Sequence, residues 1–175
     1  GVAELTMACI CIGMSLHGGV IAACGTFFVF SDYMKPALRM AALMEQPVKF
    51  IWTHDAFRVG EDGPTHQPVE VRLLEKLKNH KGNNSMLVLR PADGAETTVA
   101  WKMAMENTST PTALILSRQN VVDLPSQGDR YQDALGAEKG AYILNEDANP
   151  DVTLIASGSE VSTLVDGAAL LRADG

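Results

Sequence analysis

The stretch THDAFRVGEDGPTHQP, residues 53–68, concentrates side chains that can carry protons and bind polar ligands. His54 and His66 bring imidazole groups, which gain and lose protons readily near neutral pH. Asp62 adds a carboxylate that can accept a hydrogen bond from a ligand hydroxyl. This composition indicates recognition of a hydroxylated ligand, while a solvated surface turn stays open as the alternative. A metal site is disfavoured because the two histidines lack the short spacing that would aim both at one ion.

Two charged residues elsewhere in the chain are further candidates. Arg118 follows the apolar run TALIL, and a guanidinium at the carboxyl end of a strand can bind phosphate through two hydrogen bonds. Glu4 is a single acid ahead of an apolar helical stretch. It is either a helix-start acid favoured by the helix dipole or a carboxylate sheltered from water.

Three aromatic residues, Phe27, Phe30 and Tyr33, recur at intervals of three in the segment GTFFVFSDY. Packing into the hydrophobic core is one interpretation of this spacing. A flat slot for the ring of a ligand is the other.

These candidates must be positioned by the regular elements between them. Short apolar runs alternate with amphipathic stretches, which predicts an α/β fold with a parallel sheet flanked by helices. We expect strands at residues 20–27, 48–53, 86–90, 112–117 and 152–156. We expect helices at residues 4–16, 34–44, 69–79, 95–107 and 160–173. Because ligands bind beyond the carboxyl ends of parallel strands, the loop 53–68 is the predicted site.

Local signals refine the helices and the domain boundaries. Ser157 and Glu160 have the spacing of a capping box, and Pro36 predicts that its helix begins just before it or kinks there. Residues 121–149 contain several glycines and mixed charges, with one possible strand at 141–144, and are typical of an interdomain linker. Since Gly1 opens directly into a helical pattern, we expect the chain to be a fragment.

Composition limits the class of protein. The chain has 175 residues, 46% hydrophobic and 20% charged, which is typical of a globular protein. A net charge of −7 argues against nucleic acid as a partner. No apolar run reaches the roughly 18 residues that cross a membrane, and we expect a cytoplasmic protein. We expect Cys9, Cys11 and Cys24 to be buried, reduced thiols.

Taken together, the sequence resembles the transketolases. The resemblance is carried, in chain order, by MSLHGG, GTFFVFSDY, ALRMAAL, THDAFRVGEDGPTHQPVE, LRPAD, TALILSRQN and ASGSEV. The fourth of these strings is the most specific. The resemblance implies a thiamine diphosphate-binding fold, with a partial pyrimidine-binding domain at 1–123, a linker at 124–148 and the start of a C-terminal α/β domain at 149–175.

Resemblance to this family also implies an activity. Transketolases use thiamine diphosphate and magnesium to move a two-carbon ketol unit between phosphorylated ketose and aldose sugars in the pentose phosphate pathway. They act as homodimers, with each site formed between two subunits. The magnesium ligands are expected in an amino-terminal domain outside these residues, so we expect this chain alone to be inactive.

The family pattern implies a role for each candidate residue. Glu4 would bind a ring nitrogen of the cofactor's aminopyrimidine, and the three aromatic residues would line and stack on that ring. His66 would transfer protons beside the reacting carbons, and Asp62 would bind a substrate hydroxyl. His54 and Arg118 would hold the sugar phosphate.

Two alternatives stay open. A 1-deoxyxylulose-5-phosphate synthase-like enzyme is favoured by GVAE at residues 1–4, whereas THQP and SRQN favour transketolase. A non-catalytic, transketolase-like binding module would keep the sheet without binding cofactor. Ala3 departs from the arginine that usually precedes the family's glutamate, which affects the expected surroundings of Glu4.

Overall fold

The computed structural model describes residues 3–55, 58–68 and 71–174. The chain forms two compact units, and each is described by itself. The first comprises Gly1–Leu89 with Ala104–Gln119, and the second comprises Arg90–Met103 with Asn120–Gly175. Helix α4 (Gly94–Glu106) contributes residues to both.

The first unit is built on a parallel sheet of four strands in the order β1-β2-β4-β3. The strands are β1 (Ala23–Phe27), β2 (Lys49–Thr53), β3 (Leu87–Leu89) and β4 (Thr112–Ile115). The two central strands are nearly continuous apolar runs because helices and loops cover both of their faces. Phe50, Trp52 and Ile115 are fully buried there. The predicted α/β class with a parallel sheet is confirmed.

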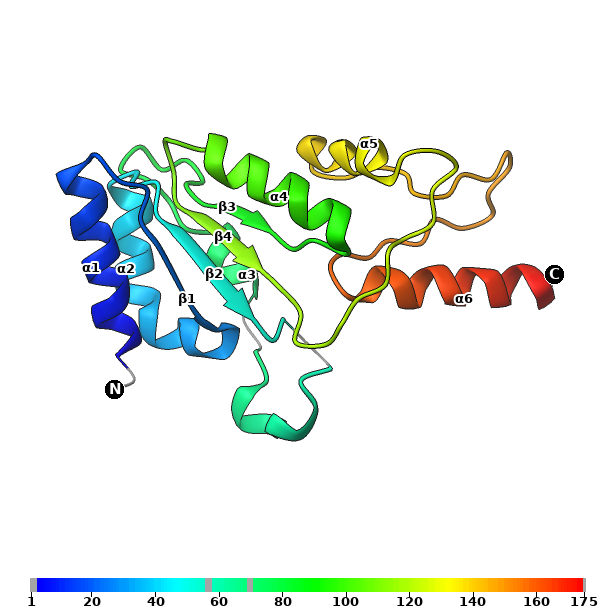
Figure 1. Cartoon of the computed structure of the whole chain (residues 1–175), viewed down its shortest axis with the longest axis horizontal. Coiled ribbons are helices and arrows are strands. Elements are labelled where there is room, and N and C mark those ends of the chain that lie inside the picture. Colours follow the sequence, from blue (N-terminus) through cyan, green and yellow to red (C-terminus); the bar gives the residue numbers. More distant parts are fainter. Residues whose placement is uncertain (1–2, 56–57, 69–70, 175) are drawn as a thin grey trace. The chain divides into compact units, whose positions relative to one another are not determined.

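Two helices pack together beside strand β1. They are α1 (Glu4–His17) and α2 (Ser31–Leu43), and Figure 1 shows them side by side. Ala8 of α1 and Leu38 of α2 are fully buried in the core. The short 3₁₀ turn η1 (Phe28–Phe30) leads directly into α2. Of the two alternatives for Pro36, a helix start just before it is wrong, since α2 begins at Ser31 and contains the proline, whereas a kink at Pro36 stays a prediction.

The helix predicted at residues 69–79 is much shorter. Residues 69 and 70 lie outside the described residues, and α3 covers only Val71–Glu75. A polar turn follows it, in which the Asn79 side-chain oxygen accepts hydrogen bonds from the backbone N–H groups of Lys81 and Asn83, both at 3.0 Å. Asparagine competes for backbone donors in this way, which favours a turn over a helix that reaches residue 79.

The strands predicted at 152–156 and 141–144 are wrong, because both segments are irregular. Ile155 is 87% exposed and Val152 is 66% exposed. A strand needs a neighbour to receive its backbone hydrogen bonds, and the second unit has no other strand among its described residues. An apolar run alone therefore does not form a strand here.

The second unit is helical, with α5 (Arg130–Ala134), a 3₁₀ segment η3 (Leu135–Lys139) and α6 (Glu160–Asp174). The first two lie within residues 124–148, where the sequence indicated a linker. The helix expected at 160–173 is confirmed as α6. Ser157 and Glu160 do not form the predicted cap with each other. Both bind Arg90, which donates to the Ser157 carbonyl at 2.9 Å and forms an ion pair with Glu160.

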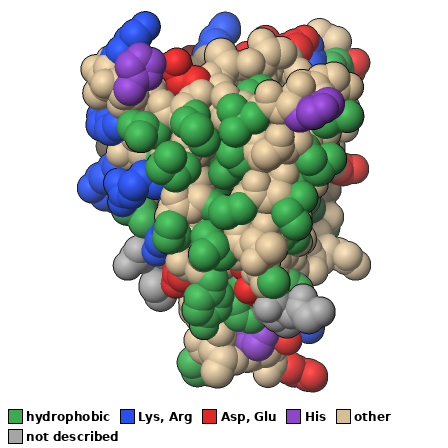
Figure 2. Space-filling view, turned by 90° about the vertical axis from the view of Figure 1, so that its left-hand side faces the viewer, with side chains coloured by type: hydrophobic (Ala, Val, Ile, Leu, Met, Phe, Trp, Pro, Cys, Tyr) green, Lys and Arg blue, Asp and Glu red, His purple; other side chains and the backbone are tan. Residues whose placement is uncertain are grey.

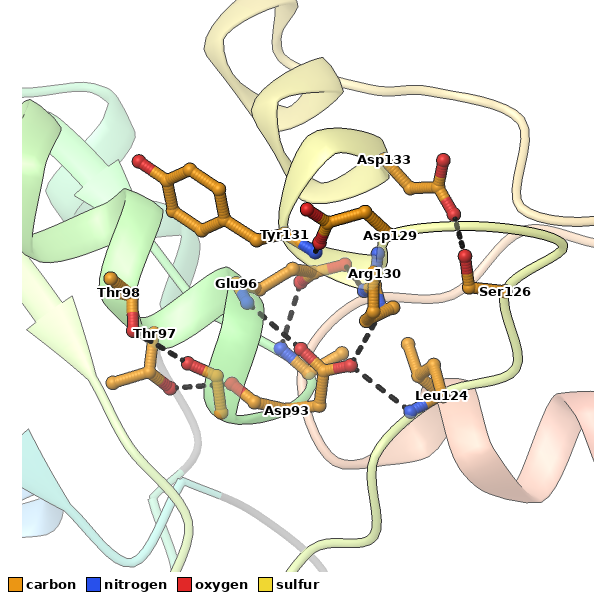
Figure 3. Close-up of polar contacts among 12 residues, drawn as sticks. Asp93, Glu96, Thr97, Thr98, Leu124, Ser126, Asp129, Arg130, Tyr131 and Asp133 are labelled. Atoms are coloured by element: carbon orange, nitrogen blue, oxygen red, sulfur yellow. Dashed lines mark hydrogen bonds and ion pairs between the residues drawn. The ribbon is translucent and has the colours of Figure 1, made fainter.

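A buried polar network organises this unit, and Figure 3 shows the contacts around Asp93. The Asp93 carboxylate is fully buried and accepts hydrogen bonds from the Glu96 N–H at 2.8 Å, the Leu124 N–H at 3.0 Å and Arg130 Nε at 2.7 Å. Arg130 also donates to Glu96 Oε1 at 3.1 Å and to the Tyr142 oxygen at 2.7 Å. Burial and the hydrogen bond to Glu96 raise the pKa of the Tyr142 hydroxyl, which therefore stays protonated.

Candidate functional site

The candidate residues of the first unit lie at the carboxyl edge of its sheet. Because the strands are parallel, β1, β2 and β4 end at the same edge, as Figure 1 shows. Three segments follow these strand ends: η1, the 3₁₀ segment η2 (Gly60–His66) and the residues around Arg118. This edge is where ligands bind in parallel α/β sheets.

The aromatic residues form a stacked series at this edge. The ring centroids of Phe27 and Phe30 lie 5.9 Å apart at an angle of 16°, and those of Phe30 and Tyr33 lie 6.1 Å apart at 29°. Tyr33 is 64% exposed, so core packing does not account for its position. The series is a partly open aromatic surface of the kind that can support a flat ligand ring.

His54 connects this aromatic surface to the charged residues. Its ring centroid lies 3.9 Å from that of Phe27, and its Nε2 lies 3.3 Å from Asp62 Oδ2. Since a carboxylate can only accept, a hydrogen bond across this contact requires a proton on His54 Nε2, and Nδ1 lies 3.0 Å from the Thr53 hydroxyl. The backbone of His54 has a φ of +65°, a left-handed conformation that is uncommon for residues other than glycine and that recurs at functional sites.

His66 presents the opposite arrangement of its ring nitrogens. Its ring packs edge-on to Phe27 and Phe30, with centroid distances of 5.5 Å and 5.4 Å. The Thr65 hydroxyl donates to the Asp62 carbonyl at 3.1 Å and lies 2.8 Å from His66 Nδ1. Because that hydroxyl has only one proton, it accepts from Nδ1–H. Neutral His66 then has a lone pair on Nε2 and can accept a proton there.

Asp62 joins the β2 loop to the β4 loop. Its Oδ2 lies 3.1 Å from Arg118 Nε, in addition to its contact with His54. The Arg118 guanidinium also lies against Gly60, where an added Cβ would be 3.4 Å from Nη1. Gly60 has a φ of +73°, which a side chain would strain. The positive φ therefore favours glycine where the loop turns beside Arg118.

Glu4 is the first residue of α1 and is 8% exposed. The chain leaves α1 and returns along β1, so the start of α1 lies at the end of the unit where β1 finishes (Figure 1). Ala8 is fully buried on the same helix, whereas Ile10 is 57% exposed and does not shelter the carboxylate. In the described part of the chain, no hydrogen bond or ion pair joins Glu4 to the other candidates.

The structure therefore brings seven of the eight candidates into one connected group: Phe27, Phe30, Tyr33, His54, Asp62, His66 and Arg118. Glu4 lies at the same edge without a direct contact. Thr53 and Thr65, which orient the two histidines, were missed. The repeated Thr–His pair at 53–54 and 65–66 is the sequence signal that points to them.

The three cysteines lie outside this group of candidate residues. Cys11 and Cys24 are buried as expected, but the prediction for Cys9 is wrong because it is exposed. Burial, together with the neighbouring Cys11 thiol, raises the pKa of Cys24 to about 12.

Within residues 3–55, 58–68 and 71–174, no cluster of three metal-binding side chains occurs. No helix in those ranges is long and apolar enough to cross a membrane.

Comparison with known proteins identifies the family. A family model for the transketolase pyrimidine-binding domain matches residues 1–123. This chain belongs to the transketolase family. A second model, for the transketolase-like C-terminal domain, matches residues 140–175. The predicted resemblance to transketolase is confirmed and is favoured over both alternatives.

Individual transketolases match along the whole chain. The transketolase of Bacillus subtilis is 49% identical over 174 residues, covering 98% of this chain and 25% of that protein. The structure of transketolase from Leishmania mexicana superposes with a TM-score of 0.87 at 41% identity, covering 99% of this chain and 24% of that one. The chain thus spans about a quarter of the length of the curated relatives it matches.

A split-gene relative is also similar. A structure described as "Split gene transketolase, inactive beta4 tetramer" superposes with a TM-score of 0.76 at 28% identity. It covers 100% of this chain and 52% of that one.

Proposed function

We propose that this chain supplies the pyrimidine-binding part of a thiamine diphosphate-dependent transketolase. The enzyme would transfer a two-carbon ketol unit from a phosphorylated ketose to a phosphorylated aldose, in the pentose phosphate pathway. The observation that carries the proposal is the convergence of His54, Asp62, His66 and Arg118 beside an open aromatic surface. Membership of the transketolase family supports it.

The residues of the first unit fit the aminopyrimidine part of the cofactor. Phe27, Phe30 and Tyr33 offer a stacked surface that is not fully buried, as a flat ring requires. Glu4 offers a carboxylate that is largely withdrawn from water at the same edge of the unit. When bound, thiamine diphosphate supplies the electron sink that the transfer of a ketol unit needs.

Glu4 would hold a proton on a ring nitrogen of the aminopyrimidine. Because the Glu4 carboxylate is buried, water would compete little for this contact, and the hydrogen bond would be strong. The aromatic surface would fix the plane of the ring, and so the direction of this bond.

His66 would move a proton at the substrate. Its Nδ1–H is engaged by Thr65, so Nε2 would receive a proton from a substrate hydroxyl and return it later in the reaction. Its packing against Phe27 and Phe30 would hold the imidazole beside the ring of the cofactor. Asp62 would accept a hydrogen bond from another hydroxyl of the sugar.

His54 and Arg118 would bind the sugar phosphate. The chain carries a net charge of −7, so an anionic substrate needs local donors to overcome the overall repulsion. Arg118 is 41% exposed and reachable by a ligand, whereas His54 is 12% exposed and held firmly by its neighbours. Arg118 would thus be an exposed donor to the phosphate, and His54 would be a largely buried one.

Magnesium and the diphosphate would be held by a partner domain outside these residues. We also propose that the full-length enzyme is a homodimer located in the cytoplasm. An exposed apolar face on α1 and α2 supports the homodimer (Figure 2), and it includes Leu5, Ile10, Met14, Leu16, Met40 and Leu43. An apolar surface of this kind is typical of a protein interface.

The chain by itself would be inactive, because it would lack the residues that bind the diphosphate. The similar split-gene transketolase, whose β4 tetramer is described as inactive, supports this expectation. We propose the division into a pyrimidine-binding domain at 1–123, a linker at 124–148 and a C-terminal domain at 149–175. The first family match ends at residue 123 and supports the first boundary, whereas the second begins at residue 140, inside the proposed linker.

Replacing Arg118 by glutamine tests the substrate site. In a full-length transketolase carrying this sequence, Arg118→Gln is expected to raise KM for a phosphorylated aldose by about 10- to 100-fold, because a charge-assisted bond is lost. KM for glycolaldehyde, which has no phosphate, is expected to change less than about threefold. Steady-state kinetics with both acceptors measure the difference. Arg172→Gln, an exposed arginine of α6, is the matched control. Equal losses with both acceptors would contradict the assignment.

A further inference from the structure

We infer that Asp62 and the substrate phosphate compete for the same pair of donors, so that phosphate binding releases the Asp62 carboxylate toward the sugar. This inference rests on the proposed function, in which His54 and Arg118 bind the phosphate. It gives Asp62 a second role as the internal counter-ion of the phosphate site.

The contacts of one oxygen atom carry the inference. Asp62 Oδ2 lies 3.1 Å from Arg118 Nε and 3.3 Å from His54 Nε2. A phosphate oxygen bound by Arg118 Nε and His54 Nε2 would take the same position relative to both donors. A carboxylate oxygen and a phosphate oxygen cannot share that position, because both are negatively charged and only accept hydrogen bonds.

The Asp62 side chain can leave without rearranging the loop. Its backbone carbonyl is held by the Thr65 hydroxyl at 3.1 Å, which anchors the residue independently of its carboxylate. The side chain is 31% exposed and so has open space on one side. A change of the Asp62 side-chain rotamer would free both donors, and His66, which binds the same Thr65 hydroxyl, would keep its orientation.

The exchange would couple two recognition steps. A phosphorylated sugar would take the donors of His54 and Arg118 and leave the Asp62 carboxylate to accept a sugar hydroxyl. A sugar without phosphate would leave Asp62 paired with Arg118, which reduces its capacity to bind that hydroxyl. The site would thus favour ligands that carry both groups.

Titration of the 175-residue chain with inorganic phosphate tests the competition. The Nε–H signal of Arg118 in a ¹H–¹⁵N NMR spectrum reports binding in the wild-type protein and in Asp62→Asn. Asp62→Asn is expected to bind phosphate about two- to fivefold more tightly, since exposed ion pairs contribute modestly. The backbone spectrum verifies that the variant is folded.

Glu61→Gln is the matched control, because it removes the same charge from the neighbouring, exposed residue of η2. It is expected to tighten binding by about 1.5-fold or less, through weaker and screened electrostatics. If Glu61→Gln tightens phosphate binding as much as Asp62→Asn does, the effect comes from net charge alone and the inference is overturned. Unchanged or weaker phosphate binding by Asp62→Asn would also overturn it.

Arg118→Gln separates this inference from the proposed function. Its phosphate binding is followed by backbone signals of residues 60–66. If the Arg118→Gln variant binds phosphate with the same affinity as the wild type, the assignment of His54 and Arg118 as the phosphate site is wrong. If Arg118→Gln loses phosphate binding while Asp62→Asn matches the wild type, the site stands and only the competition is refuted.

Discussion

Replacing Glu4 by glutamine in a full-length transketolase that carries this sequence is expected to lower kcat by about 10²- to 10⁴-fold. Glutamine has the same shape, but it cannot hold a proton on the aminopyrimidine as a carboxylate does. Because Glu4 is 8% exposed, water would not replace the lost group efficiently. The loss is expected in kcat more than in KM, since Glu4 acts on the cofactor and not on the sugar.

Steady-state kinetics at saturating thiamine diphosphate measure this effect, and calorimetric titration with the cofactor separates binding from catalysis. Glu75→Gln is the control, because Glu75 lies on α3 and is exposed. Its kcat is expected to stay within about twofold of the wild type. A Glu4→Gln enzyme with wild-type kcat would show that the carboxylate is only a favourable residue at the start of a helix.

Replacing Asp93 by asparagine is expected to lower the free energy of unfolding of the chain by about 3–5 kcal/mol. Asp93 is fully buried and accepts three hydrogen bonds, one of them from Arg130. Within the described part of the chain, the substitution leaves the guanidinium of Arg130, which is 12% exposed, with Glu96 as its only carboxylate partner. Among the described residues, Arg130 Nη1 is buried without a hydrogen-bond partner, so the loss of Asp93 would add to the unsatisfied donors of this guanidinium.

Urea denaturation followed by circular dichroism measures the loss. Asp133→Asn removes a carboxylate from α5 that binds Ser126 at 2.6 Å on the exposed surface (Figure 3). That control is expected to cost less than about 1 kcal/mol. Equal stabilities for the two variants would mean that the buried network does not stabilise this unit.

The two central strands of the sheet could be predicted from sequence because they are largely buried on both faces and therefore consist of short apolar runs. The same rule failed at residues 152–156, where Ile155 is 87% exposed and no strand is available for pairing among the described residues of the second unit. The apolar pattern of a segment reflects the burial of its side chains. Strand formation also depends on backbone hydrogen bonds to a strand elsewhere in the chain. The helix α5 was missed because it is only five residues long and is held by Arg130 and its partners.

The types of residues at the candidate site could be predicted, but their contacts could not. Asp62 and Arg118 are 56 positions apart, and only the parallel pairing of β2 with β4 brings their loops together. The two histidines look equivalent in sequence. Nδ1 of each histidine contacts the hydroxyl of the preceding threonine, but His54 also contacts the Asp62 carboxylate through Nε2, which distinguishes the two.

A crystal structure of the full-length protein with thiamine diphosphate would test the central claim most directly. We expect the aminopyrimidine to stack against Phe27, Phe30 and Tyr33, with a ring nitrogen about 2.7–3.0 Å from the Glu4 carboxylate. His66 Nε2 is expected to face the same ligand. An aminopyrimidine bound away from these rings, or a Glu4 carboxylate directed into solvent, would contradict the account.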